Sequence, residues 1–220
     1  RPPRSTPKPS SAASDVYKRQ FYNQTKEVGI KPTPSIGGVG LIKDYKKMIS
    51  IDLKEVDNLV LIIGKTEGHI DQSLFARTIL DEKNGPPPEV NLFNEKNNGE
   101  SILNLIDKGY VKSAHDISLG GLLVAISKMC IKGNKGIKIN KSKNLINEIE
   151  YFFAEDQGRY LIEINKKDLK EVTKILNKNS VYHEEFGIIT KNDMVINEKT
   201  KLTIDELKSY YTNWLTKYMS

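Results

Sequence analysis

Apolar positions in this chain form short runs that alternate between the spacing of strands and the spacing of helices. The continuous apolar run 59–63 is typical of a buried strand. Tyr110, Val111 and Ala114 predict a second short strand, and the apolar positions of 122–130 recur at helical spacing. A strand therefore leads through a short connection into a helix at this point in the chain.

The same pattern predicts most of the remaining secondary structure. Strands separated by single helices favour an α/β protein, or an α+β sandwich in which helices cover a sheet. The break around 44–55 is a candidate domain boundary, and Thr203 with Glu206 is expected to cap the last helix. Further helices are predicted near 73–80 and 99–108 and at 142–153, 168–177 and 204–218, and further strands at 36–42, 137–139, 159–164, 181–189 and 194–196.

A polar turn with two glycines is expected between the strand near residue 111 and the helix that follows it. Such a turn directs backbone N–H groups and the positive end of a helix dipole toward one point, which suits a phosphate or a carboxylate. In the alternative interpretation the glycines only allow close packing and Asp116 or Ser118 caps the helix. Spacing alone leaves both open. The candidates for phosphate or nucleotide binding are His115, Asp116, Ser118, Gly120 and Gly121.

Composition indicates a soluble chain of 220 residues that is long enough for one large or two small domains. Hydrophobic content is 38%, and we expect neither a membrane partner nor a secretory signal. Cys130 is the single cysteine, which excludes a disulfide within the chain and fits the cytoplasm. We expect Cys130 to be a core residue, and His69 and His183 to be surface residues, because no metal-ligand spacing relates them.

The formal net charge of +6 is concentrated at the start of the chain. Residues 1–20 hold five basic residues, one acidic residue and four prolines, and they differ from the Lys-, Asn- and Ile-rich remainder. We interpret 1–20 as a disordered, non-native leader; a native flexible tail is the alternative. Elsewhere Lys is mixed with Asp and Glu, and no aromatic row lies beside a basic stripe, so nucleic acid is not expected as a partner.

Several longer motifs then occur in one order, beginning with Phe-Tyr-Asn-Gln-Thr at 21–25 and Pro-Thr-Pro-Ser-Ile-Gly-Gly-Val-Gly-Leu-Ile at 32–42. Leu-Ile-Ile-Gly-Lys-Thr, Asn-Gly-Glu, His-Asp-Ile-Ser-Leu-Gly-Gly-Leu and Phe-Ala-Glu-Asp-Gln-Gly-Arg-Tyr follow. This series resembles the C-terminal part of the synthetase subunit of phosphoribosylformylglycinamidine synthase, and the resemblance covers essentially 21–220. It implies an ATP-dependent ligase of purine biosynthesis that converts formylglycinamide ribonucleotide to the amidine with ammonia from glutamine.

The resemblance also implies an architecture and partners. Residues 21–48 resemble the tail of the second nucleotide-binding domain, and 55–220 resemble the C-terminal domain of the aminoimidazole ribonucleotide synthase type, with helices on a mixed sheet. The full enzyme is expected to use ATP and Mg²⁺. Expected partners are the missing N-terminal half, the glutaminase subunit and the small accessory subunit of the complex.

Site residues transfer only where the motifs match. Glu155, Asp156 and Gln157 resemble a Glu-Ser-Gln stretch that contacts substrate in the first half of the family, although a structural or auxiliary-nucleotide role is equally open here. Arg159 is expected to pair with Glu155 or with an anion. We assign Asn23 to the domain junction and Thr33 and Pro34 to a rigid turn beside it.

One departure from the family limits the expected activity. The family carries Gly-Asn-Val-Ser before the Phe-Tyr-Asn stretch, and Tyr17, Lys18, Arg19 and Gln20 occupy these positions here. We therefore assign no catalytic residue and no metal ligand, and we expect the isolated chain to be inactive. Two alternatives stay open: a related ATP-using enzyme of the selenophosphate synthetase, thiamine-phosphate kinase or aminoimidazole ribonucleotide synthase type, and a non-catalytic assembly module.

Overall fold

A computed structural model describes residues 24–25, 28–29, 37–42, 44–139 and 146–219. The chain divides into two compact units, 1–43 and 44–220. In the first unit, the two-residue strands β1 (Gln24–Thr25) and β2 (Val28–Gly29) pair antiparallel. Positions 37–42 form no strand, so the predicted strand is wrong there. Its apolar residues, Val39 and Leu41, are fully exposed and have no partner strand in the described part of this unit.

The second unit is built on a mixed sheet whose seven described strands run in the order β4-β6-β3-β7-β5-β8-β9. Neighbouring strands are antiparallel except β5 and β8, which are parallel. The strands are β3 (Leu59–Ile63), β4 (Val111–Asp116), β5 (Gly136–Ile139), β6 (Tyr160–Ile164), β7 (His183–Thr190), β8 (Asp193–Ile196) and β9 (Thr200–Thr203). The predicted strands from 59 onward are thus confirmed in place, and the sequence pattern missed only β9 among these.

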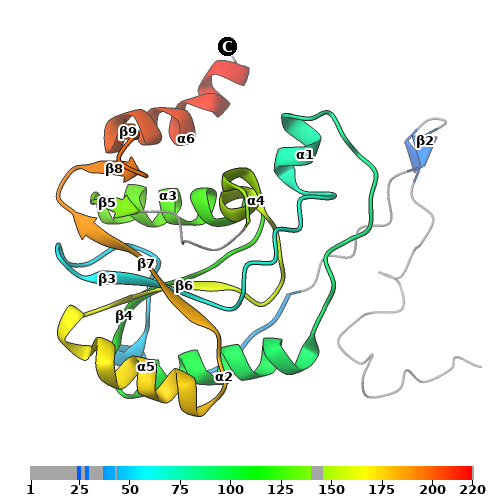
Figure 1. Ribbon diagram of the computed structural model, residues 1–220. Coiled ribbons are helices and arrows are strands. Elements are labelled where there is room, and N and C mark those ends of the chain that lie inside the picture. Colours follow the sequence, from blue (N-terminus) through cyan, green and yellow to red (C-terminus); the bar gives the residue numbers. More distant parts are fainter. Residues whose placement is uncertain (1–23, 26–27, 30–36, 43, 140–145, 220) are drawn as a thin grey trace, which may run out of the picture. The chain divides into compact units, whose positions relative to one another are not determined.

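Helices cover both faces of the sheet, as Figure 1 shows. One face packs against α3 (Gly121–Gly133), α4 (Glu148–Phe153) and the start of α6 (Ile204–Met219). The other packs against α2 (Leu92–Asp107) and α5 (Leu169–Lys178). A short helix, α1 (Leu74–Thr78), follows β3. The expected sandwich of helices on a mixed sheet is confirmed.

Strand β3 explains why the sandwich has two cores. All five of its residues are buried, and successive side chains point to opposite faces of the sheet. Val60 and Ile62 enter the core under α3, whereas Leu59, Leu61 and Ile63 enter the core over α2 and α5. Burial of each such side chain stabilises the fold by about 1.5–3 kcal/mol.

Two helix starts differ from the sequence prediction. Helix α2 begins at Leu92 rather than near 99, because Asn91 caps it by accepting a hydrogen bond from the Asn94 N–H at 3.0 Å. The exposed first two turns of α2 carry few apolar residues that periodicity could detect. Helix α4 begins at Glu148 rather than at 142, and Asn147 is its N-cap residue. Residues 142–145 of the predicted helix lie outside the described residues.

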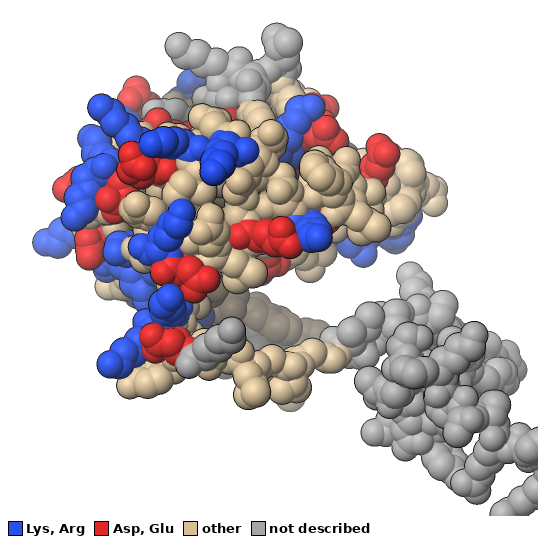
Figure 2. Space-filling model, turned by 90° about the horizontal axis from the view of Figure 1, so that it is seen from below, with Lys and Arg blue, Asp and Glu red and all other residues tan. Residues whose placement is uncertain are grey.

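The last helix begins as predicted. Thr203 and Glu206 form a reciprocal capping box, in which the Glu206 carboxylate accepts from the Thr203 N–H at 2.8 Å. Within the described residues, no helix has the length and apolarity needed to cross a bilayer. Basic and acidic side chains are intermixed over the face of this unit shown in Figure 2, in agreement with the charge mixing read from the sequence.

Candidate functional site

His115 and Asp116 belong to the end of β4, not to the turn that the sequence predicted. The strand extends this far because β6 pairs with it, with His115 opposite Leu161 and Asp116 opposite Tyr160. His115 Nδ1 and Asp116 Oδ1 lie 3.0 Å apart, while the buried His115 Nε2 has no hydrogen-bond partner in the described structure. Partial burial acts to raise the pKa of Asp116, but interactions with Ser118 and His115 outweigh it and lower that pKa below 3.8.

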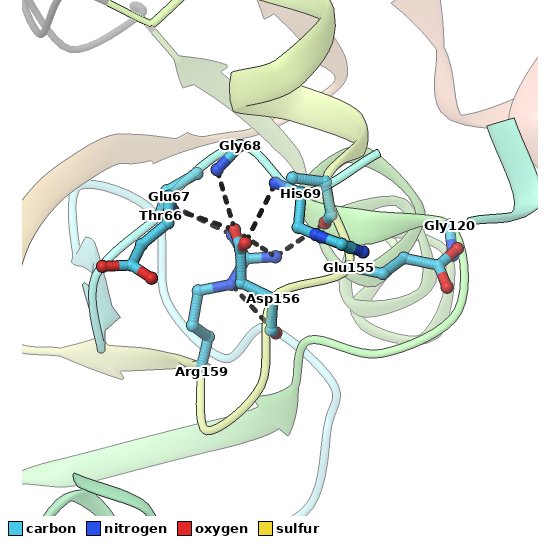
Figure 3. Close-up of polar contacts among 9 residues, drawn as sticks. Thr66, Glu67, Gly68, His69, Gly120, Glu155, Asp156 and Arg159 are labelled. Atoms are coloured by element: carbon cyan, nitrogen blue, oxygen red, sulfur yellow. Dashed lines mark hydrogen bonds and ion pairs between the residues drawn. The ribbon is translucent and has the colours of Figure 1, made fainter. Parts of the chain in front are cut away.

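The start of α3 is closed by a carboxylate of the protein itself. The N-cap residue of α3 is Gly120, which has no side chain, so neither Asp116 nor Ser118 is the cap that the alternative interpretation expected. Instead Glu155 Oε1 accepts hydrogen bonds from the Gly120 N–H at 2.8 Å and from the Leu74 N–H at 2.7 Å. The glycine donor that suited a phosphate is already satisfied (Figure 3).

Gly121 supports the close-packing interpretation of the two glycines. Its φ is +69°, and a Cβ atom there would lie 2.7 Å from the Ala154 carbonyl oxygen. Any side chain would therefore separate the start of α3 from the end of α4. The Gly121 N–H donates to the Ser118 carbonyl at 3.0 Å, so it too is used within the turn.

Asp156 organises the loop that follows β3. Its carboxylate accepts three consecutive backbone N–H groups, from Glu67 at 3.0 Å, Gly68 at 3.2 Å and His69 at 3.0 Å. Figure 3 shows these groups converging on the carboxylate. Charge-assisted hydrogen bonds of this kind are roughly twice as strong as neutral ones. The Asp156 side chain therefore fixes the backbone from 67 to 69.

Arg159 is a buried support for the same loop, with its side chain fully enclosed. It donates to Thr66 Oγ1 at 3.0 Å and to the Ala154 carbonyl at 2.6 Å, and its Nη2 lies 3.7 Å from Asp156 Oδ2. Of the two expected partners, Glu155 or an anion, Glu155 is turned toward Gly120, and the anionic group beside Arg159 is the Asp156 carboxylate. Burial lowers the pKa of Arg159, and Asp156 opposes that shift.

A polar cleft of about 550 Å³ opens beside this organised loop. Its walls come from the loop after β3, the segment that enters α2, the first two turns of α2, and the turn before β6. Of the candidate binding residues named from the sequence, only Asp156 and Gln157 reach it. The lining residues are Lys65, Glu67, Gly68, His69, Pro88, Glu89, Asn91, Asn94, Glu95, Asn98, Asp156, Gln157 and Gly158.

The cleft is lined by amides and carboxylates. Asn91, Asn94 and Asn98 come from one helix start at spacings of three and four residues, which places them on one face of α2. Asn98 Nδ2 donates to the Gly158 carbonyl at 2.9 Å and so joins the α2 wall to the turn before β6. His69, expected to be a surface residue, lines the cleft, and its Nε2 lies 3.1 Å from the Pro86 carbonyl.

The charge of the cleft is acidic. Among its lining residues, Lys65 is the one lysine, and its Nζ lies 3.1 Å from Glu67 Oε1. Glu89 and Glu95 contribute further carboxylates. Burial together with Glu95 and Asp116 raises the pKa of the neighbouring Tyr160. In the described part of the chain, no three His, Cys, Asp or Glu side chains are grouped so that they could hold a metal ion. The cleft is thus better suited to hydrogen bonding than to holding a bare phosphate.

The match to a family model decides where this fold belongs. Residues 55–196 match the model described as AIR synthase related protein, C-terminal domain. The chain belongs to this family. The matched range contains every wall of the cleft and the whole Glu155–Arg159 segment, so the cleft lies within the matched domain.

Relatives of known sequence extend the similarity beyond that domain. The chain is 66% identical over 199 residues to subunit PurL of phosphoribosylformylglycinamidine synthase from Pelagibacter ubique, and 38% identical over 199 residues to that of Bartonella henselae. Both alignments cover 90% of this chain but only 27% of the relative. The chain therefore spans about a quarter of the length of these curated relatives.

Solved structures support the fold. Thermotoga maritima PurL complexed with FGAR has a TM-score of 0.61 at 18% identity, covering 74% of this chain and 29% of that one. Escherichia coli HypE, a hydrogenase maturation protein, has a TM-score of 0.52 at 16% identity, covering 71% of this chain and 52% of that one. At such identities the likeness shows a shared fold alone.

The contacts in the structure do not follow the two groups of site residues that the sequence predicted. Glu155 and Gly120, predicted in two different groups, contact each other directly, and Gln157 is exposed at the cleft. The amides of α2 were missed because the helix was expected to begin near 99. With the correct start, the spacing of Asn91, Asn94 and Asn98 is the signal that finds them. Asn23, Thr33 and Pro34, and the leader 1–20, lie outside the described residues.

Proposed function

We propose that this chain is the C-terminal part of an ATP-dependent phosphoribosylformylglycinamidine synthase, a carbon–nitrogen ligase that uses glutamine-derived ammonia. The observation that carries the proposal is the 66% identity over 199 residues to Pelagibacter ubique PurL. Within that stretch, residues 55–196 match the AIR synthase-related family model. In this proposal 21–48 is the tail of a nucleotide-binding domain, 55–220 is the synthase C-terminal-like domain, and 1–20 is foreign to both.

The proposed contribution of this chain is the polar cleft rather than the phosphoryl chemistry. Gly120 and Gly121 donate their N–H groups within the protein, and the described residues present no set of Mg²⁺ ligands. These residues do not fit ATP phosphates or Mg²⁺, so we assign ATP and Mg²⁺ to other parts of the full synthase. Gln157, Asn94 and Glu95 face the cleft and are the proposed hydrogen-bonding groups for a bound ligand.

The proposal includes partners and a compartment. The remaining part of the synthetase polypeptide would supply the catalytic half, and the glutaminase and small accessory subunits would supply ammonia and assembly contacts. The name of Thermotoga maritima PurLQS, another fold relative, is consistent with such an assembly. A cytoplasmic location fits the buried free thiol of Cys130, whose pKa burial raises to about 12.

A chimeric enzyme tests the proposal directly. The segment of Pelagibacter ubique PurL that matches this chain is replaced by residues 22–220 of this chain, and amidine formation is assayed with ATP, Mg²⁺, ammonia and formylglycinamide ribonucleotide. We expect activity within about tenfold of the parent, a cost of at most about 1.4 kcal/mol in transition-state stabilisation. The isolated chain is expected to form no amidine.

A folded chimera without activity contradicts the proposal. The matched control is the same chimera with Lys174→Ala, a change on the exposed face of α5 far in sequence from the cleft segments. If this control and the parent chimera are active while a chimera with Gln157→Ala and Asn94→Ala loses substrate affinity, the cleft is the ligand site. Equal activity of all three removes the cleft from the proposal and leaves only the family assignment.

An assembly role is the second candidate, and helix α6 favours it. Ile204 and Leu207 pack on the core, and the same helical stripe continues as Tyr211, Trp214 and Tyr218, which are exposed. Exposed apolar stripes of this kind mark interaction surfaces. Trp214 is the single tryptophan, so a blue shift of its emission on mixing with the remaining part of the synthase would support this role. An unchanged emission at saturating concentration would contradict it.

A further inference from the structure

Two Asn-Gly pairs with opposite surroundings occur in this chain, at Asn84-Gly85 and Asn98-Gly99. Asn-Gly is the dipeptide in which a side-chain amide is most open to attack by the next backbone nitrogen, because glycine has no side chain to hinder the approach. Asparagine is accordingly among the thermolabile residues of proteins. The two pairs let the effect of structure be separated from the effect of sequence.

Asn84 lies in the exposed segment that joins α1 to α2, drawn at the right of Figure 1. Among the described residues, neither its side-chain amide nor the Gly85 N–H has a hydrogen-bond partner. Gln72 holds the turn from outside, since its Nε2 donates to the Lys83 carbonyl at 2.9 Å and to the Gly85 carbonyl at 3.1 Å. Both reacting groups of this pair are therefore open to solvent.

The glycine of this pair is required by the fold. Gly85 has φ of +113°, and a Cβ atom there would lie 2.7 Å from the Asp71 side chain. At this positive φ, any other residue would have a strained backbone, and its Cβ would clash with Asp71. The turn thus retains a reactive pair that a bulkier second residue would protect.

Asn98 has the opposite surroundings. It is 6% exposed, and its Nδ2 donates to the Gly158 carbonyl at 2.9 Å. Gly99 lies within α2, where each backbone N–H donates to the carbonyl four residues earlier. Both the side chain that would be attacked and the nitrogen that would attack are held by hydrogen bonds.

We infer that Asn84 is a site of spontaneous deamidation that adds a carboxylate to the segment leading into the cleft. The Gly85 nitrogen forms a bond to Asn84 Cγ, the bond from Cγ to Nδ2 breaks, and ammonia leaves with the proton of the Gly85 N–H. Water then opens the resulting five-membered imide at either carbonyl, which gives aspartate or isoaspartate. The reaction requires water but no oxidant, metal or enzyme.

The modification has consequences for the loop. The new carboxylate joins Asp81 and Glu82 on a segment that already packs against Asp71, so it adds like-charge repulsion. Isoaspartate also lengthens the main chain by one methylene group, between the two carbonyls that Gln72 holds. Pro88, Glu89 and Asn91, which follow directly, line the cleft, so the modified loop displaces that wall.

The test compares the two pairs within one preparation. The full 220-residue chain is incubated in mildly alkaline buffer, and peptides are sequenced by mass spectrometry for the one-dalton gain and for isoaspartate. In the native chain, we expect Asn84 to react at least about tenfold faster than Asn98, which corresponds to about 1.4 kcal/mol of opening free energy at α2. In chain unfolded by urea, the two rates should converge.

Two variants give the test its controls. Asn84→Gln should remove the signal at 84, because the longer side chain would have to close a six-membered ring, and it should leave Asn98 unchanged. Gly99→Ala, which has open space around it, should leave the Asn84 rate unchanged. The inference is overturned if native Asn98 reacts as fast as Asn84, or if native Asn84 stays intact after the unfolded chain has reacted.

Discussion

The segment 155–159 and the first two turns of α2 face the same cleft with similar polar residues, but they use them differently. Glu155, Asp156 and Arg159 are turned inward and bind the protein's own backbone, whereas Asn94 and Glu95 present their side chains to the cleft. Burial accounts for the difference between Asp156 and Arg159, which are buried, and Asn94, which is exposed. A buried charge is costly unless it is paired and hydrogen-bonded, so the inward groups gather partners, and exposed groups have no such requirement.

This contrast shows how to interpret a charged motif near a cleft. In Glu155-Asp156-Gln157, the two neighbouring carboxylates accept hydrogen bonds from loop backbone, although Asp156 also borders the cleft, and only the Gln157 amide is left without such a bond in the described structure. Substitutions in the supporting segment should therefore change stability first. Substitutions of Asn94, whose side chain lines the cleft without bonding to another element in the described structure, should change ligand affinity without changing stability.

Arg159→Met should have the largest effect. The change removes three hydrogen bonds, to the carbonyls of Asp156 and Ala154 and to Thr66, and leaves the Asp156 carboxylate buried without its cation. We therefore expect a loss of about 3–5 kcal/mol in the free energy of unfolding. Urea denaturation followed by circular dichroism measures it. Lys65→Met, at an exposed ion pair, is the matched control and should cost about 0.5 kcal/mol or less. Equal losses in both variants would remove the distinction.

Asp156→Asn should cost about 2 kcal/mol, because an amide cannot accept three backbone N–H groups as a carboxylate does. Hydrogen exchange gives the specific readout: the amides of Glu67, Gly68 and His69 should exchange faster than in the parent chain. Amides of β3 should change only by the loss in global stability. Unchanged protection at 67–69 would show that another group holds this loop.

Glu155→Gln should cost about 1 kcal/mol, since the side-chain carbonyl retains an acceptor for Gly120 and Leu74 but loses the charge. Glu155→Ala should cost about twice as much because both donors lose their partner. Thermal unfolding of the two variants, compared side by side, measures the contribution of the charge. If Gln and Ala cost the same, the charge alone supports the start of α3.

The double variant Asn94→Ala, Gln157→Ala tests the side chains that face the cleft. Both side chains line the cleft, and neither supplies a hydrogen bond to another element in the described residues, so we expect the free energy of unfolding to change by about 0.5 kcal/mol or less. Urea titration checks this. A loss comparable to that of Asp156→Asn would mean that the α2 face supports the fold as well.

Asp116→Asn should have the smallest effect and a defined dependence on pH. The folded-state pKa of Asp116 lies below its ordinary value of 3.8, so its carboxylate adds stability above that pH, and the gain disappears as the pH falls through the folded-state pKa. Parent and variant should therefore differ slightly at neutral pH and converge in acid. Because the side chain is 61% exposed, solvent screening keeps the difference small. A difference that grows in acid would contradict this.

The sequence by itself determined the layered architecture and most of its elements. The apolar run 59–63 and the periodicity of 169–178 specify their strand and helix because each element must bury the face that the other elements cover. The capping box at Thr203 was equally visible, since its bonds join residues three positions apart.

Only the tertiary structure decided which polar groups are available to a ligand. The bonds that occupy Glu155 and Asp156 reach partners 35 to 89 residues away, and the cleft is closed by segments equally remote in the chain. Likewise, pairing with β6 places His115 and Asp116 in β4, although the sequence predicted a turn there. Local pattern determines what each segment becomes, but contacts between distant segments determine which side chains remain free, because those contacts form only when the layers have packed.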